Sequence, residues 1–257
     1  MFNKAKNSLE PFFNNPLSKE RKFSNLLHAA IADNQGNMWI STYSQGVDKV
    51  SFNKSDFQFV RPVSSDVYTN ANEIRALYKD LQGMLWVGSR RGYVYVFDEE
   101  NKLKGRLTNA GSIGNGNLFE APVYNFTEDK KGNIWLSTKG KGLYKLSRRG
   151  SNKFEISNYR HSDSNKYSIS SDAVYNVHVD KQNNIWIATF GGGVNLLNDN
   201  NDAPVFINKN NQLRNYPKFL CNRARYITSD NNGNYYVGTT DGLPHIVTGK
   251  QIGRAHV

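Results

Sequence analysis

The chain has 257 residues, a hydrophobic content of 38% and a formal net charge of +11. No run of about 18 consecutive apolar residues occurs, so the sequence predicts no membrane-spanning helix. Residues 1–25 lack the apolar core of a signal peptide, and the single cysteine, Cys221, excludes an internal disulfide. The basic residues are scattered as singles and short pairs, which argues against nucleic-acid binding.

Residues 1–19 precede the first copy of a repeat that fills residues 20–251. Their segment FNKAKNSLEPFF has the character of the outer strand of that repeat. We therefore expect residues 1–19 to supply the outer strand of a preceding unit, followed by a linker.

The repeat is marked by an aromatic residue that recurs at intervals of 47, 49, 51 and 50 residues, with an aspartate six residues before each copy. A period near 50 residues that is built from short strands predicts a β-propeller. We interpret these aspartates and aromatics as structural residues of the repeat: Asp33 and Trp39, Asp80 and Trp86, Asp129 and Trp135, Asp180 and Trp186, Asp230 and Tyr236.

Each unit contains four predicted strands. The first is a run such as EIRALYK, and an Asp-x-x-Gly turn joins it to the strand that carries the aromatic residue. Asn183 replaces the turn glycine in the fourth unit, and asparagine is the residue best able to adopt a positive φ in its place. A third strand follows a glycine, as in GLYKL, and SDFQFVRP and NKFEISNYRH are predicted outer strands.

Alternation along the aromatic strand places the ring and the residue two positions later on one face. That later residue is always small (Ser41, Gly88, Ser137, Ala188 or Gly238), which predicts close approach of neighbouring sheets. The aspartate turns offer too few oxygens for calcium. We therefore expect no metal site and no cofactor.

The segment from Ser168 to Leu197, SISSDAVYNVHVDKQNNIWIATFGGGVNLL, resembles the two-component regulator propeller repeat. The resemblance covers residues 20 to 250, with departures at Tyr236 and Pro244. It implies an all-β fold, a β-propeller of four-stranded antiparallel blades, with about five blades present from an incomplete seven-bladed propeller. Residues 252–257, IGRAHV, match no part of the repeat and are predicted to be a non-native tail on a fragment.

Proteins with this repeat are periplasmic sensor regions of hybrid two-component histidine kinase and response regulator proteins of Bacteroidetes. The resemblance therefore implies a location on the periplasmic side of the inner membrane and recognition of an oligosaccharide. It also implies that the signal passes to a histidine kinase absent from this chain. The remaining blades and the kinase region would be partners within the parent chain, and contact with the membrane would come only through those missing parts.

In such a propeller the loops after the aromatic strands and the segments that lead into each blade share one face. These loops vary between units, and binding specificity is normally placed in variable loops on a rigid repeat. Their cations and aromatics favour a uronic or sulfated oligosaccharide. The candidate ligand-binding residues are Tyr43, Gln45, Arg90, Arg91, Lys139, Lys141, Phe190, Asp241, Arg223 and Arg225, with Arg61, Tyr68, Asn115, Asn117 and His161 on the lead-in segments.

Two other functions are weighed against ligand sensing. A protein-interaction scaffold without a small-molecule ligand, including a homodimer formed through the sheets, uses the same surfaces, and the sequence does not separate it from glycan recognition. An enzyme is disfavoured because glycoside hydrolysis needs two converging carboxylates, whereas Asp66, Glu120 and Asp241 are isolated. We therefore predict no catalytic residues.

Overall fold

The computed structural model describes residues 2–3, 8–9, 27–35, 37–42, 46–51, 60, 62–63, 70–198, 204–211, 213, 221–240 and 242–248. Every regular element in these residues is a β-strand, and none of them forms a helix that could cross a membrane. The chain divides into two compact units, Met1–Phe59 and Val60–Val257, so the predicted repeat region 20–251 contains the boundary between them. The tail 252–257 lies outside the described residues.

The first unit contains a small hairpin and one sheet. Strand β1 (Phe2–Asn3) pairs with β2 (Ser8–Leu9). Strands β3 (Leu27–Ala32), β4 (Asn37–Thr42) and β5 (Gly46–Ser51) form a three-stranded antiparallel sheet, which we call blade one. The outer strand predicted at SDFQFVRP lies mostly outside the described residues.

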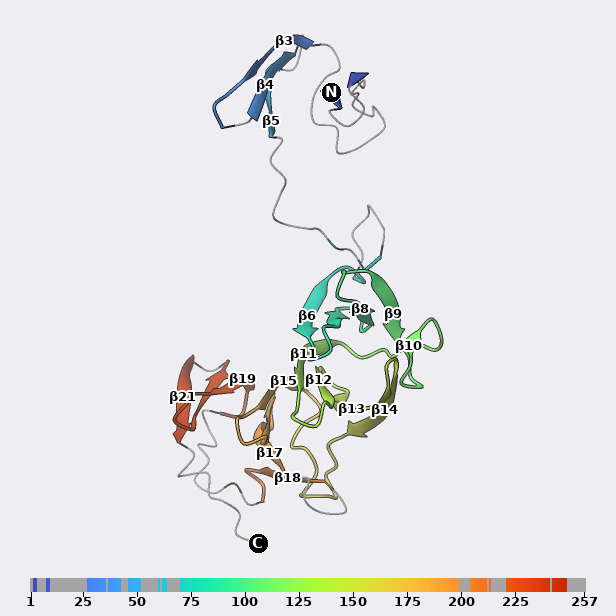
Figure 1. The fold of residues 1–257 in the computed structure, drawn as a ribbon. Coiled ribbons are helices and arrows are strands. Elements are labelled where there is room, and N and C mark those ends of the chain that lie inside the picture. The colour runs from blue at the N-terminus through green and yellow to red at the C-terminus, as the bar shows by residue number, and fades with distance from the viewer. Residues whose placement is uncertain are drawn as a thin grey trace. The chain divides into compact units, whose positions relative to one another are not determined.

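The second unit contains four successive antiparallel sheets, which we call blades two to five. Their first strands lie side by side in chain order, with β6 (Ile74–Lys79) next to β11 (Val123–Glu128), β11 next to β15 (Val174–Val179), and β15 next to β19 (Ala224–Ser229) (Figure 1). This arrangement confirms the predicted all-β propeller fold. Blade two comprises β6 (Ile74–Lys79), β7 (Leu85–Ser89), β8 (Val94–Phe97), β9 (Leu103–Leu107) and β10 (Ile113–Gly114). Blade three comprises β11 (Val123–Glu128), β12 (Ile134–Thr138), β13 (Gly142–Gly150) and β14 (Lys153–Tyr159), and blade four comprises β15 (Val174–Val179), β16 (Ile185–Thr189), β17 (Gly193–Asn198) and β18 (Val205–Asn208). Blade five comprises β19 (Ala224–Ser229), β20 (Asn234–Thr239) and β21 (Gly242–Thr248).

The core lies between neighbouring blades, as the alternation of the aromatic strand predicts. Trp135 packs with Val174 and Val177 of the following blade, while Ile134 and Leu136 pack with Trp86 of the preceding blade. Trp135 is completely buried. Burial of one such ring removes roughly 200 Å² from water and contributes about 5 kcal/mol before entropy is counted.

The small residue two places after the aromatic ring allows this close packing. A Cβ built on Gly88 would lie 3.0 Å from Cβ of Val123 and 3.3 Å from the ring of Phe126, both in the next blade. Any larger side chain at Gly88 would therefore push blades two and three apart.

Each turn aspartate joins its own turn to the aromatic ring six residues later. In blade three, Oδ1 of Asp129 accepts the backbone N–H groups of Lys131 (2.9 Å) and Asn133 (3.0 Å), and Oδ2 accepts Nε1–H of Trp135 (2.9 Å). The six-residue spacing therefore places the aspartate where its carboxylate closes the turn and also accepts a hydrogen bond from the aromatic side chain. In blade five the hydroxyl of Tyr236 replaces the indole and donates to Oδ2 of Asp230 at 3.1 Å.

A segment between β9 and β11 adds a feature that the repeat does not predict. It gives blade two its short fifth strand, β10, and it also bonds to the outer strand of blade three. The N–H of Phe154 donates to the carbonyl of Gly111 (2.6 Å), and the N–H of Ile113 donates to the carbonyl of Asn152 (3.0 Å). The edge of β14 is therefore partly covered, which protects it from pairing with another chain.

Candidate ligand-binding face

One repeated backbone hydrogen bond brings each loop to its lead-in segment. The first residue of the loop after the aromatic strand donates its backbone N–H to the carbonyl of the residue directly before the inner strand. This bond joins Arg90 to Glu73 (2.7 Å), Lys139 to Pro122 (3.1 Å), Phe190 to Ala173 (2.9 Å) and Thr240 to Arg223 (3.2 Å). The loops and the lead-in segments therefore meet at the same end of blades two to five.

A β-bulge lies beside this bond in each inner strand of blades two to five. In blade two Ile74 pairs with Ser89 and Ala76 pairs with Gly88, so Arg75 between them has no partner across the ladder. A bulge re-aims the side chain of its extra residue. The same register shift places Tyr124, Tyr175 and Arg225 at the bulges of blades three to five, and His28 at the bulge of blade one.

Three positions per blade therefore define one surface, which we call the bulge face: the bulge residue, the residue two places before it, and the first loop residue. Five of these side chains are cationic and Glu73 alone is acidic. The members are Glu73, Arg75 and Arg90 in blade two, Pro122, Tyr124 and Lys139 in blade three, Ala173, Tyr175 and Phe190 in blade four, and Arg223, Arg225 and Thr240 in blade five.

Aromatic rings form the middle of the bulge face. The ring centroids of Tyr124 and Tyr175 are 5.0 Å apart, and those of Tyr175 and Phe190 are 5.8 Å apart. All three side chains are half-buried. They make a short row of rings that runs from blade three to blade four.

Two arginines stack on the blade-four end of this row. The guanidinium carbon of Arg225 lies 4.6 Å from the ring centroid of Tyr175 and 5.1 Å from that of Phe190, and Arg223 lies 5.7 Å from Phe190. Stacking fixes the plane of a guanidinium and leaves its N–H groups directed outward, where they can bind an anion.

A pocket of about 390 Å³ lies at the other end, lined by Arg75, Arg90, Pro122, Tyr124 and Lys139. Glu73 holds two of these cations, because its carboxylate pairs with Nη1 of Arg90 at 2.9 Å and with Nη2 of Arg75. The aromatic row is thus flanked by cations at both ends.

The structure brings together five of the predicted site residues on the bulge face: Arg90, Lys139, Phe190, Arg223 and Arg225. Lys141 is exposed on the loop after Lys139. Nε–H of Arg91 donates to the hydroxyl of Tyr93 at 2.9 Å, and its guanidinium lies over that ring. Tyr43, Gln45, Asp241, Arg61 and Tyr68 lie outside the described residues. Asn115 and Asn117 follow β10, the outermost strand of blade two.

The bulge residues Arg75, Tyr124 and Tyr175 and the acid Glu73 were missed from the sequence. A signal for the bulge residues does exist, because each lies five residues before the turn aspartate. A prediction that assumes strict alternation along the inner strand assigns this position to the wrong face of the sheet. The bulge adds one residue to the strand, so the residues before it point to the opposite face from the one that alternation predicts.

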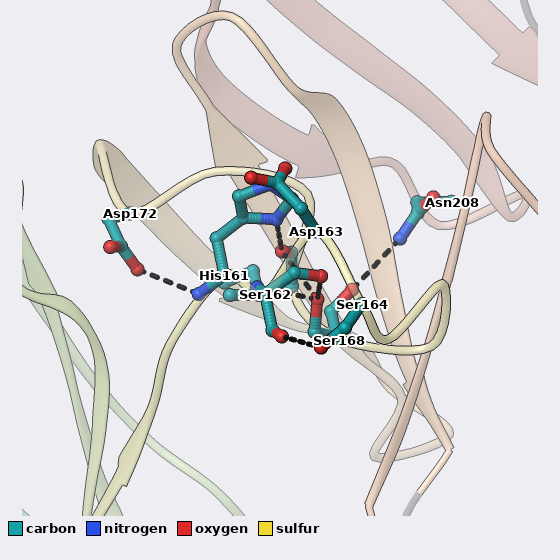
Figure 2. A network of polar contacts seen from close by, with 8 residues as sticks. His161, Ser162, Asp163, Ser164, Ser168, Asp172 and Asn208 are labelled. Carbon is teal, nitrogen blue, oxygen red and sulfur yellow. Dashed lines mark hydrogen bonds and ion pairs between the residues drawn. The ribbon is translucent and has the colours of Figure 1, made fainter.

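His161 takes part in a polar network on the segment between β14 and β15 (Figure 2). Its ring contacts the carbonyl of Ile169 through Nδ1 (2.8 Å) and Oδ1 of Asp163 through Nε2 (3.0 Å). The backbone N–H of His161 donates to Oδ1 of Asp172 (2.8 Å). The carbonyl of Asp172 in turn accepts the N–H groups of Gly140 and Gly142, each at 3.0 Å. The network therefore fastens the loop that carries Lys139.

Comparison with known proteins agrees with this architecture. The family model described as "Two component regulator propeller" matches residues 117–140 and 168–191. No curated protein matches the chain.

Among solved structures, the extracellular domain of the putative hybrid two component system BT3049 from B. thetaiotaomicron is 16% identical, with a TM-score of 0.54, over 91% of this chain and 35% of that one. The extracellular domain of the putative one component system BT4673 from B. thetaiotaomicron is 15% identical, with a TM-score of 0.38, over 89% and 34%. The Cps50 (Swd1) beta-propeller domain of Myceliophteria thermophila is 13% identical, with a TM-score of 0.49, over 74% and 56%. The chain spans about a third of the length of the first two structures.

Proposed function

We propose that this chain, a propeller with two segments that match the two-component regulator propeller model, is part of a ligand-sensing region and binds an acidic oligosaccharide along its bulge face. The observation that carries the proposal is the row of Tyr124, Tyr175 and Phe190 with cations at both ends. The bound ligand would be sensed, and no chemical step is assigned to this chain.

The chemistry of the bulge face suits such a ligand. Ring faces bind the apolar faces of sugar rings by burying their C–H groups, and guanidinium groups bind carboxylate or sulfate through paired N–H bonds. Neutral sugars would use the rings alone. The five cations of the bulge face therefore favour a chain that carries anionic substituents at more than one position.

The wider setting is also a proposal. The fold is similar to that of an extracellular domain of a putative hybrid two component system. We propose a periplasmic position for this chain within a longer protein, with the signal passing to a histidine kinase in the rest of that protein.

Calorimetry on the whole chain tests the proposal with three oligosaccharides of equal length that are neutral, uronic and sulfated. Acidic sugars should bind, and the Arg225→Gln and Tyr175→Ala variants should weaken that binding about tenfold or more. Arg149→Gln is the matched control, because Arg149 is exposed and pairs with Glu155 in the β13–β14 hairpin.

Two results would count against this function. Equal binding of neutral and acidic sugars would remove the role of the cations. Absence of binding to every sugar, together with a stable complex with a protein encoded nearby, would support the alternative of a protein-interaction scaffold.

A further inference from the structure

We infer that the pocket lined by Arg75, Arg90 and Lys139 is a subsite for one tetrahedral oxyanion, such as a sulfate ester on the ligand, and that Glu73 guards it as an internal competitor. Glu73 pairs with both arginines, and an incoming anion must displace its carboxylate. The identification of the anion as part of a sugar rests on the proposed function, whereas the anion subsite itself does not.

The geometry of the ion pairs shows that Glu73 bridges the two arginines. One carboxylate oxygen, Oε1, pairs with Arg75, and the other, Oε2, pairs with Arg90. The side chain of Glu73 is 24% exposed, against 38% for Arg75 and 55% for Arg90. The acid is therefore less exposed than both bases, and all three side chains reach the solvent.

The scaffold does not require an acid at this position. The repeated backbone bond uses the carbonyl of Glu73, which accepts the N–H of Arg90 at 2.7 Å, and every residue type supplies a carbonyl. The equivalent position holds Pro122, Ala173 or Arg223 in the following blades. The fold of the repeat therefore does not explain the carboxylate of Glu73, and its role is specific to blade two.

A third cation comes from the next blade. Lys139 is exposed and lines the same pocket, and its ammonium group has no ion-pair partner among the residues that the structure describes. Three cations around one pocket match a tetrahedral oxyanion, whose three terminal oxygens can each accept from a different cation. A carboxylate has only two oxygens to offer.

The two ends of the bulge face consequently differ. Arg225 stacks on two rings, and within the described part of the chain no carboxylate pairs with it. Binding at Arg225 displaces no carboxylate of the described residues, while binding at the Arg75 end requires Glu73 to give up two charge-assisted bonds. Because an anion must compete with the Glu73 carboxylate for both arginines, an anion that binds them strongly displaces Glu73 and one that binds them weakly does not.

Titration of inorganic sulfate tests the subsite without any sugar. Wild type and Glu73→Gln are compared by following the backbone amide signals of residues 73–75, 90 and 139 in NMR spectra. Glutamine keeps the size of the side chain and the backbone bond but removes the competing charge. We expect Glu73→Gln to bind sulfate about fivefold to tenfold more tightly, and Lys139→Met to reverse much of that gain.

The control for net charge is Glu155→Gln, which removes an acid paired with Arg149 in the β13–β14 hairpin. Its sulfate affinity should stay within about twofold of wild type. Equal affinities in Glu73→Gln and wild type, or equal gains in Glu73→Gln and Glu155→Gln, would overturn the inference.

A sulfated disaccharide and its unsulfated counterpart separate the two proposals. Tighter binding of the sulfated sugar by Glu73→Gln supports both the guarded subsite and the sugar function. If sulfate binds more tightly to Glu73→Gln but neither disaccharide binds any variant, the anion subsite stands and the oligosaccharide function fails. If the sulfated sugar binds but Glu73→Gln changes nothing, the sugar function stands and the role of Glu73 is wrong.

Discussion

The hydroxyl of Tyr235 donates a 2.6 Å hydrogen bond to Oδ2 of Asp180, so the second strand of blade five is fastened to the turn of blade four. The same carboxylate oxygen accepts Nε1–H of Trp186 at 3.1 Å, and the rings of Trp186 and Tyr235 lie 4.5 Å apart. Burial alone would raise the pKa of Asp180, but the hydrogen bonds from Tyr235, Asn184 and Trp186 outweigh it and hold this pKa below its usual value. Burial and the bond to Asp180 raise the pKa of Tyr235 well above that of a free tyrosine.

Removal of the Tyr235 hydroxyl should therefore loosen blade five. We expect Tyr235→Phe to lower the free energy of unfolding by about 2 kcal/mol, because a hydrogen bond to a buried charged acceptor is lost. Denaturant unfolding followed by tryptophan fluorescence measures the change. Tyr226→Phe is the control, since Tyr226 is 57% exposed, and a loss of equal size in that variant would contradict the interpretation.

Asp180 also predicts a dependence of stability on pH. Its pKa is depressed in the folded chain, so its contribution is complete above the unfolded value near 3.9 and is lost as pH falls through the lower folded value. The stability difference between wild type and Tyr235→Phe should shrink as the pH is lowered from about 6 toward 2. A difference that stays constant over that range would show that Tyr235 does not act through the Asp180 carboxylate.

Arg148 and Asp80 form an ion pair between blades three and two. Nη2 of Arg148 lies 3.0 Å from Oδ2 of Asp80, with side-chain exposures of 17% and 0%. Arg148→Ala should cost about 3 kcal/mol of unfolding free energy, because it leaves a buried carboxylate without its counter-charge. Arg149→Ala, next in the chain but 61% exposed, should change that free energy by less than about 0.5 kcal/mol. Similar losses in both variants would contradict an effect of burial.

Ser137 offers a substitution that should increase stability. Its hydroxyl is buried and has no hydrogen-bond partner in the described residues, and the equivalent residue of blade four is Ala188. Ser137→Ala should raise the free energy of unfolding by about 1 kcal/mol.

Thr189 provides the opposite case, because its hydroxyl is buried but donates to the carbonyl of Gly193 at 2.8 Å. Thr189→Val should lower the free energy of unfolding by about 1 kcal/mol. Thermal unfolding of both variants beside wild type measures the contrast. A destabilised Ser137→Ala would mean that this hydroxyl contributes through a contact absent from the structure.

The sequence by itself determined the propeller, because the features that specify it are periodic and local. The spacing from Asp129 to Trp135 repeats in every blade, and the alternation around Trp135 assigns each side chain to one of two neighbouring sheets. Those patterns follow from the two-residue period of a strand and from turn chemistry, and neither depends on residues far away.

Only the tertiary structure decided which side chains make the candidate site. The bulge at Arg75, Tyr124, Tyr175 and Arg225 depends on the hydrogen-bond register between two strands, which hydropathy does not encode. The pairing of Glu73 with Arg75 and Arg90 needs a strand and a loop that meet across 17 residues of sequence. Charge and aromatic content thus indicated what kind of ligand to expect, while the folded register selected the residues that would hold it.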